Sequence, residues 1–246
     1  MKKIIRKIFK LLGLNLTKDN PANSPEKQIL KVLDLLNITT VLDIGANEGQ
    51  FAKQIRNLGY CGKIISFEPL SSARKKLTHL SKKDNDWIVY DQCAIGDKDG
   101  SVNFNISSNS VSSSALAMLK SHSSASPESV YIGSETVPII KLDSIINEIL
   151  DKNANLFIKV DTQGYEKKVF DGAEKTLDKV SGIICELSLV PLYEGQYLWR
   201  QIIEYLDTKG FMLWAIQKGF TDPNTGQSLQ MDGIFLRKKK LKPKNS

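Results

Sequence analysis

The sequence is poor in the residues that build metal centres and disulfide frameworks. Its 246 residues include three cysteines, Cys61, Cys93 and Cys185, which are widely separated. An odd number of distant cysteines suits neither a disulfide framework nor a zinc site. The two histidines, His79 and His122, are too few for a histidine-rich metal site. We therefore expect a cytoplasmic protein of a reducing compartment, without a bound metal.

Basic residues are also scarce once the two ends of the chain are set aside. The net charge is +7, but residues 1–16 hold five basic residues and no acidic one, and residues 237–246 hold six and none. The stretch between them has 23 basic and 27 acidic residues. This balance does not predict the basic face that nucleic-acid-binding domains carry.

The N-terminal segment, MKKIIRKIFKLLGLNL, is too short and too charged to cross a bilayer, and no small-residue cleavage site follows it. Its apolar residues recur at helical spacing, with the lysines and Arg6 between them. The pattern predicts either reversible docking on an anionic inner membrane surface, aided by the basic C-terminal tail, or a helix packed on its own domain. We divide the chain into this helix (1–18), one domain (19–237) and the tail (238–246).

Apolar runs of strand length alternate with helical patterns through the body of the chain. Strands are expected at 39–44, 63–68, 87–95, 100–106, 137–140, 155–161, 182–187, 211–217 and 231–237. Helices are expected at 25–37, 48–58, 71–81, 142–150, 165–178 and 196–208. Strands separated by helices indicate a parallel sheet covered on both faces, and the last two strands indicate an antiparallel hairpin. We predict an α/β, Rossmann-like fold with a doubly wound, mostly parallel seven-stranded sheet and an antiparallel edge hairpin.

The first expected strand ends in an acidic residue and a glycine-bounded loop, TTVLDIGANEGQF. Glycine lets the backbone turn sharply and lets a ligand approach it closely. A dinucleotide fingerprint needs glycine where Asn47 stands, and the Asp43 carboxylate would repel a pyrophosphate. Glu68, at the end of the next strand, suits two ribose hydroxyls. A ligand with a ribose, an ammonium group and no phosphate matches S-adenosylmethionine.

Five stretches of the chain resemble the FkbM-type methyltransferases: VLDIGANEGQFA, ISFEP, KVDTQGYEKKVFDGA, IICEL and MDGIFLRK. The resemblance extends from about residue 39 to residue 237, and residues 159–173 are its most specific part. It implies a class I methyltransferase fold that uses S-adenosylmethionine to methylate hydroxyl groups of sugars or polyketides.

The resemblance also implies the residues of the cofactor site. The loop after the first strand would line the methionine and ribose portions, Glu68 would hold the ribose hydroxyls, and residues 92–95 would lie beside the adenine. The residues expected at the cofactor are Asp43, Gly45, Ala46, Asn47, Gly49, Glu68, Pro69, Gln92, Ala94, Ser113 and Asp161. Five of these have structural alternatives: Asp43 and Asp161 could each cap the helix that follows, Gly45 and Gly49 could be turn residues only, and Glu68 could simply end a strand.

Three residues are candidates for the catalytic base that accepts the acceptor's proton: Asp161, Glu186 and His122. Glu186 could instead pair with a buried lysine. His122 lies in a serine-rich stretch (107–129, with 11 serines) that reads as a loop, where histidines are more often surface residues. Glu166 is expected on a helix face, paired with a lysine.

These observations predict an O-methyltransferase that acts on a carbohydrate, specifically a sugar hydroxyl of a glycolipid, polysaccharide precursor or similar glycoconjugate. One alternative is methylation of a polyketide or other small molecule. The other is a non-catalytic, membrane-tethered binding subunit with a methyltransferase-like fold.

Overall fold

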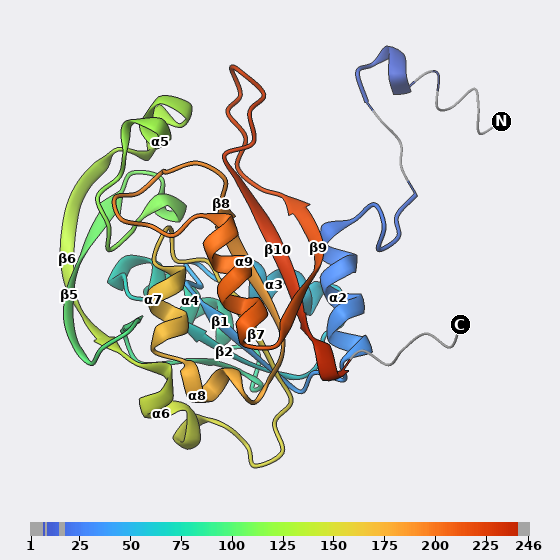
Figure 1. Cartoon of the computed structure of the whole chain (residues 1–246), viewed down its shortest axis with the longest axis vertical. Helices are drawn as coiled ribbons and strands as arrows, with labels where there is room; N and C mark the ends of the chain where they lie inside the picture. The colour runs from blue at the N-terminus through green and yellow to red at the C-terminus, as the bar shows by residue number, and fades with distance from the viewer. Residues whose placement is uncertain (1–6, 8, 15–17, 241–246) are drawn as a thin grey trace.

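The computed structural model describes residues 7, 9–14 and 18–240, and a seven-stranded sheet lies at its centre (Figure 1). The strands are β1 (Thr40–Ile44), β2 (Lys63–Phe67), β3 (Trp87–Val89), β7 (Leu156–Val160), β8 (Val180–Ser188), β9 (Phe211–Lys218) and β10 (Gln230–Arg237). Their order is β3-β2-β1-β7-β8-β10-β9. The pairs from β3 to β8 are parallel, and β10 is antiparallel to both β8 and β9. The predicted sheet and its edge hairpin are confirmed.

Helices cover both faces of this sheet. They are α2 (Pro25–Leu35), α3 (Gln50–Asn57), α4 (Ser71–Ser81), α6 (Leu142–Ile149), α7 (Glu166–Asp171), α8 (Glu174–Leu177) and α9 (Trp199–Thr208). Buried side chains of α2 and α3, with Leu77 of α4, belong to one hydrophobic cluster, and those of α6 to α9 belong to another. The sheet is therefore doubly wound, as the alternation of strand and helix patterns predicts.

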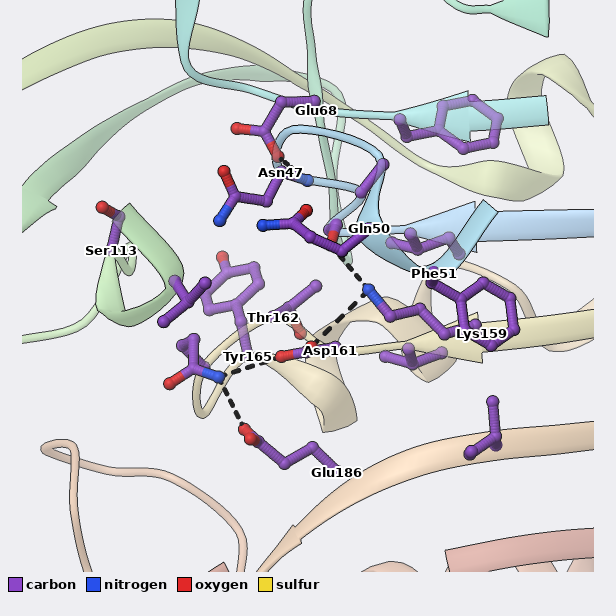
Figure 2. A pocket seen from close by; sticks show the side chains of 18 of the residues that line it. Asn47, Gln50, Phe51, Glu68, Ser113, Lys159, Asp161, Thr162, Tyr165 and Glu186 are labelled. Carbon is purple, nitrogen blue, oxygen red and sulfur yellow. Dashed lines mark hydrogen bonds and ion pairs between the residues drawn. The ribbon is translucent and has the colours of Figure 1, made fainter. Parts of the chain in front are cut away.

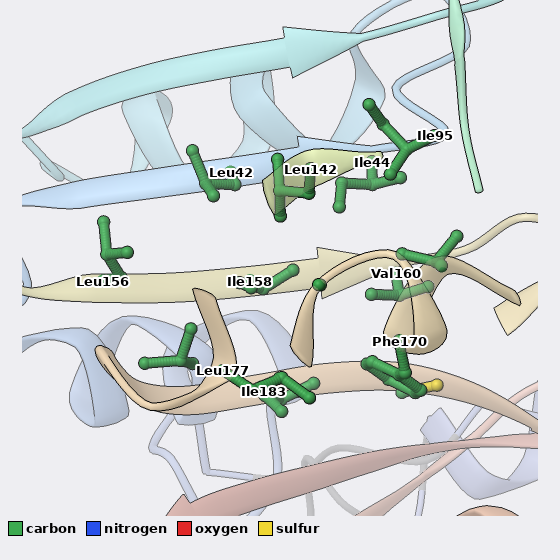
Figure 3. Packing of buried hydrophobic residues seen from close by; sticks show 14 of the residues in the cluster. Leu42, Ile44, Ile95, Leu142, Leu156, Ile158, Val160, Phe170, Leu177 and Ile183 are labelled. Atoms are coloured by element: carbon green, nitrogen blue, oxygen red, sulfur yellow. The ribbon is translucent and has the colours of Figure 1, made fainter. Parts of the chain in front are cut away.

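Strand β1 shows why its sequence, TVLDI, is mostly apolar. All five of its residues are buried, and alternate side chains face opposite sides of the sheet. Leu42 and Ile44 pack in the cluster with α6 to α9, whereas Val41 packs in the cluster with α2 to α4. Figure 3 shows Leu42 and Ile44 beside Ile158 of β7. Each such side chain stabilises the fold by roughly 1.5–3 kcal/mol through burial.

A second, three-stranded sheet was not predicted. The expected strand at 87–95 divides into β3, which joins the main sheet, and β4 (Ala94–Ile95). The short β4 pairs with β6 (Tyr131–Ile140), which also pairs with β5 (Gly100–Ser107) in antiparallel register. The serine-rich stretch between β5 and β6 contains the short helix α5 (Lys120–Ala125), so it is more ordered than a simple loop.

The helix expected at 165–178 is interrupted. Helix α7 ends at Asp171, and α8 begins at Glu174. Gly172 stands between them, and a Cβ atom there would lie 1.8 Å from the carbonyl oxygen of Gly96. The close approach of a neighbouring segment therefore requires glycine at this break, which a helical periodicity cannot predict.

Candidate active site

A cavity of about 450 Å³ lies at the edge of the sheet where β1, β2, β7 and β8 end (Figure 2). Its volume is typical of small-molecule sites, which occur at this edge in doubly wound folds. Of the residues expected at the cofactor or in catalysis, those that line the cavity are Gly45, Ala46, Asn47, Glu68, Pro69, Ala94, Ser113, Asp161 and Glu186. The cavity therefore collects most of the predicted site, from segments far apart in the sequence.

The loop after β1 takes a shape that its residue types make accessible. Gly45, Asn47 and Gly49 all have positive φ, at 75°, 47° and 90°, a region that glycine and asparagine enter most readily. The backbone N–H of Asn47 donates to Glu68 Oε2 over 2.8 Å, and the N–H of Leu70 donates to Oε1 over 2.9 Å. Burial raises the pKa of Glu68 to about 7. Each carboxylate oxygen still has a lone pair for a ligand hydroxyl.

Asp43 lies beneath this loop and does not line the cavity, contrary to the expectation that it contacts the ligand. Its side chain has no exposed surface, and Lys159 Nζ lies 3.3 Å from its Oδ1. The same Nζ donates to the carbonyl oxygen of Gly45 over 2.6 Å and lies 3.6 Å from Asp161 Oδ2. Burial raises the pKa of Asp43, and the positive charge of Lys159 opposes that rise. Lys159, which sequence analysis did not single out, separates the two carboxylates.

Gln163 fixes the two catalytic candidates that do line the cavity. Its Nε2 donates to Asp161 Oδ1 and to Glu186 Oε2, each over 2.9 Å (Figure 2). Its Oε1 accepts a hydrogen bond of 2.7 Å from the Tyr193 hydroxyl. All hydrogens of the Gln163 amide are used, so its orientation is defined, and Glu186 Oε1 has no donor among the described residues. No lysine pairs with Glu186 in the part of the chain that the structure describes.

Asp232 is an acidic residue of the cavity that sequence analysis missed. It lies directly opposite Glu186 in the antiparallel register of β10 and β8, and it lines the same cavity. Burial and the charge of Asp161 raise its pKa to about 7. Burial and the charges of Asp161, Glu166 and Asp232 raise the pKa of Glu186 well above its usual range. The only sequence signal for Asp232 was its place in the stretch MDGIFLRK.

His122 does not reach the cavity, so its predicted role as a base in direct contact with the acceptor is wrong. It is buried, and its ring packs against the rings of Tyr193 and Phe220 at centroid distances of 5.2 and 5.4 Å. Burial lowers the pKa of His122, which keeps the imidazole neutral at physiological pH. The alternative of a surface residue is wrong as well, because only 3% of His122 is exposed.

Besides Asp43, two further residues expected at the cofactor lie outside the cavity lining. Gly49 is buried under Leu77 and Trp87, and the Gln92 amide donates to the carbonyl oxygen of Pro69 and to Glu135. Both residues therefore support segments that line the cavity, and neither lines it directly.

Glu166 was expected on a helix face with a lysine, and this expectation is wrong. Its carboxylate is buried and accepts hydrogen bonds from the backbone N–H groups of Thr162 and Gly164 and from the Thr162 hydroxyl. Thr162 and Gly164 flank Gln163, so Glu166 stabilises the turn that carries Gln163.

No group of three or more His, Cys, Asp and Glu side chains within the described residues is arranged to hold a metal ion. Among the helices of the described ranges, none is both long and apolar enough to cross a bilayer.

A family model described as the methyltransferase FkbM domain matches residues 43–213. The chain is 28% identical over 186 residues to the 2-O-methyltransferase NoeI of Sinorhizobium fredii (strain NBRC 101917 / NGR234), covering 73% of this chain and 75% of that protein.

Solved structures with a similar chain trace include two methyltransferases. One is a putative caffeoyl-CoA O-methyltransferase from Staphylococcus aureus, with a TM-score of 0.48, 9% identity and coverage of 95% of this chain and 91% of that chain. The other is the magnesium protoporphyrin IX methyltransferase of Synechocystis PCC 6803, with a TM-score of 0.45, 10% identity and 96% coverage of both chains.

Proposed function

The chain belongs to the FkbM family of S-adenosylmethionine-dependent methyltransferases, and from this premise we propose that it methylates a hydroxyl oxygen of a saccharide. The observation that supports this best is the cavity itself. It joins Glu68, a carboxylate suited to ribose hydroxyls, to Glu186, a carboxylate suited to removing a proton. The 2-O-methyltransferase relative supports an oxygen atom as the acceptor.

The residues present fit S-adenosylmethionine. Glu68 and the loop 45–47 offer a carboxylate and backbone groups to the ribose and methionine portions. Pro69, Ala94 and Phe104 offer an apolar wall to the adenine ring. The buried Oδ1 of Asn47 has no hydrogen-bond partner among the described residues, so it is an acceptor still available to a ligand amine or hydroxyl. When bound, S-adenosylmethionine supplies a sulfonium methyl group, whose transfer breaks a carbon–sulfur bond and forms a carbon–oxygen bond.

Glu68→Gln should weaken binding of S-adenosylhomocysteine about 10- to 100-fold, because the amide replaces a charged acceptor and turns an N–H toward a backbone N–H. In the unmodified protein, affinity should rise between pH 6 and pH 8, since the raised pKa of about 7 leaves the carboxylate ionised only above that pH. Isothermal titration calorimetry at both pH values measures these effects.

Glu48→Gln is the matched control for Glu68→Gln, because Glu48 pairs with Lys76 outside the cavity. Equal affinities for Glu68→Gln and the unmodified protein, with the same pH dependence, would show that the ribose site lies elsewhere.

Glu186 is the better placed of the two remaining base candidates. Asp161 receives a hydrogen bond from Gln163 and lies beside Lys159, whereas Glu186 keeps one oxygen without a donor among the described residues. The hydroxyl proton of the acceptor would pass to this oxygen as the carbon–oxygen bond forms. A carboxylate with a raised pKa is a stronger base once ionised, which suits a weakly acidic sugar hydroxyl.

Glu186→Gln should reduce the rate of methyl transfer by about 10²–10⁴-fold, the usual contribution of a general base. The affinity for S-adenosylhomocysteine should change little. The unmodified enzyme should gain activity with rising pH as Glu186 ionises, and the variant should lose that rise. Single-turnover rates measured across pH test both points, and a variant that keeps the pH-dependent rise would assign the base to another residue.

Docking on a membrane remains a proposal for the two ends of the chain. Most of the expected N-terminal helix lies outside the described residues, but Leu11, Leu12 and Leu14 are described and are exposed. We infer that residues 1–18 place apolar side chains into an anionic bilayer surface, near a membrane-anchored acceptor, with the basic tail 238–246 beside them.

Deletion of residues 1–16 removes five positive charges and the apolar residues between them. Binding to vesicles of anionic phosphatidylglycerol should fall at least tenfold, because each basic residue near such a surface contributes about 1 kcal/mol. Co-sedimentation measures this, with phosphatidylcholine vesicles and cofactor affinity as controls. Unchanged sedimentation would leave packing on the domain as the role of this segment.

A further inference from the structure

The cavity continues beyond the residues proposed for the cofactor. Glu68 follows β2, whereas Gln217 belongs to β9, five strand positions away in the sheet order. At about 4.8 Å per strand, these positions are roughly 24 Å apart. We call the far part of the cavity the distal lobe, and its defining residues are Glu26, Phe51, Gln54, Gln217 and Asp232.

Three packed elements form the distal lobe. Its walls come from the first turn of α2, from α3 and from the β9–β10 hairpin. The Gln217 amide donates to the carbonyl oxygen of Pro25 and to Gln28 Oε1, over 2.9 and 2.8 Å, which fastens α2 to β9. Gln217 is only 7% exposed, so this connection is rigid and the lobe is preformed.

The polar groups of the lobe match a polyhydroxylated ligand. Both amide hydrogens of Gln217 are used, but its Oε1 has no donor among the described residues. Gln54 forms no side-chain hydrogen bond within the described part of the chain, and neither does Gln50, whose amide points into the cavity in Figure 2. Amides donate and accept at once, as hydroxyl groups do. Phe51 adds an apolar face between them.

The charges of the lobe restrict the ligand further. Glu26, Asp232 and the neighbouring Glu186 contribute carboxyl groups to the cavity, while Lys218 contributes a basic group and Lys159 is already engaged with Asp43 and Asp161. Burial and the charge of Asp161 raise the pKa values of both Asp232 and Glu186, so this part of the cavity disfavours negative charge. A ligand with its own negative charge would meet the same unfavourable surroundings.

We propose that the distal lobe is the acceptor subsite and that it takes an uncharged saccharide unit in preference to one that carries a carboxylate, sulfate or phosphate. This inference rests on the proposed function. Asp161 and Glu186 follow or end the strands between Glu68 and the distal lobe, and both line the same cavity. An acceptor in the lobe would therefore present a hydroxyl group to Glu186, the proposed base.

The test uses the full-length protein saturated with S-adenosylhomocysteine. The probes are the methyl glycosides of glucose, galactose and mannose, each paired with the methyl glycoside of the corresponding uronic acid. Binding is measured by saturation-transfer NMR. At least one neutral glycoside should bind, and its uronate should bind at least tenfold more weakly. At pH 8, Asp232→Asn should reduce that ratio, because it removes a carboxylate that is ionised above its pKa of about 7 and keeps the shape of the side chain.

A second variant tests the position of the lobe. Gln54→Ala should weaken the neutral glycoside about tenfold and leave S-adenosylhomocysteine affinity unchanged, whereas Gln227→Ala, on the exposed hairpin turn, should alter neither. Uronates that bind as tightly as the neutral glycosides, or glycoside binding unaffected by both lobe variants, would overturn the proposal. Cofactor binding without any glycoside binding would overturn the subsite alone, and absence of cofactor binding would overturn the proposed function.

Discussion

Lys159→Met should lower the free energy of unfolding by about 3–5 kcal/mol, the usual cost of removing one partner of a buried ion pair. Asp43 has no exposed surface, and Lys159 is the basic side chain beside it. Without the lysine, the buried carboxylate must either remain charged and uncompensated or take up a proton. The Gly45 carbonyl oxygen also loses its 2.6 Å hydrogen bond.

The pH dependence of this deficit has a defined sign. Removing Lys159 raises the already elevated pKa of Asp43 further, so the folded variant binds a proton that the unfolded chain releases. The stability gained from that proton is present at low pH and is lost as the pH rises through the folded-state pKa. Urea unfolding should therefore show a larger deficit at pH 8 than at pH 5.

Lys159→Met combined with Asp43→Asn is the matched control. It removes the charge that the lysine compensates, and it should recover about half of the lost stability. A double variant less stable than Lys159→Met, or a deficit that is equal at both pH values, would show that Lys159 contributes through packing and not through charge.

Gly45→Ala should abolish detectable cofactor binding and destabilise the fold by about 3 kcal/mol or more. The residue has a φ of +75°, and a Cβ atom would lie 1.9 Å from the backbone oxygen of Asp161 and 2.9 Å from its carbonyl carbon. Backbone atoms at the end of β7 cannot rotate away as a side chain can. The loop must therefore move, and with it the Asn47 N–H that holds Glu68.

Gly59→Ala is the control that separates the effect of the steric clash at Gly45 from the effect of a left-handed backbone conformation. Gly59 has a φ of +99°, but nothing lies within 4 Å of its hypothetical Cβ, so the substitution should cost only about 1–2 kcal/mol for the left-handed backbone. Thermal unfolding and calorimetric titration compare the two variants. Equal destabilisation by both, with cofactor binding retained in Gly45→Ala, would contradict a tight contact between the loop and β7.

The architecture was predictable because its signals are local. The helix expected at 71–81 is α4 with the same bounds, since its ends and its periodicity are encoded within its own residues. The buried strands β1 and β7 were recognisable as continuous apolar runs. The second sheet was not, because β4 has two residues and acquires its identity only by pairing with β6, some 40 residues later.

The site was predictable where a residue stands at or just beyond the carboxyl end of an apolar strand. Glu68 and Asp161 directly follow β2 and β7, Glu186 lies near the end of β8, and all three line the cavity. Asp232 lies near the start of an antiparallel strand and gave no such signal, and Lys159 lies within a strand, where a lysine normally indicates an exposed position.

The amino-acid sequence alone was sufficient to predict the strands of the main sheet, most of its helices, the glycine-bounded loop after β1 and the chemical types gathered at the sheet edge. Only the tertiary structure decided that Asp43 is covered and paired with Lys159, that His122 packs against Tyr193, and that Asp232 faces Glu186. The physical reason is that periodicity and turn chemistry act between near neighbours in the chain. Burial, charge pairing and pKa depend instead on which distant segments the strand order brings together.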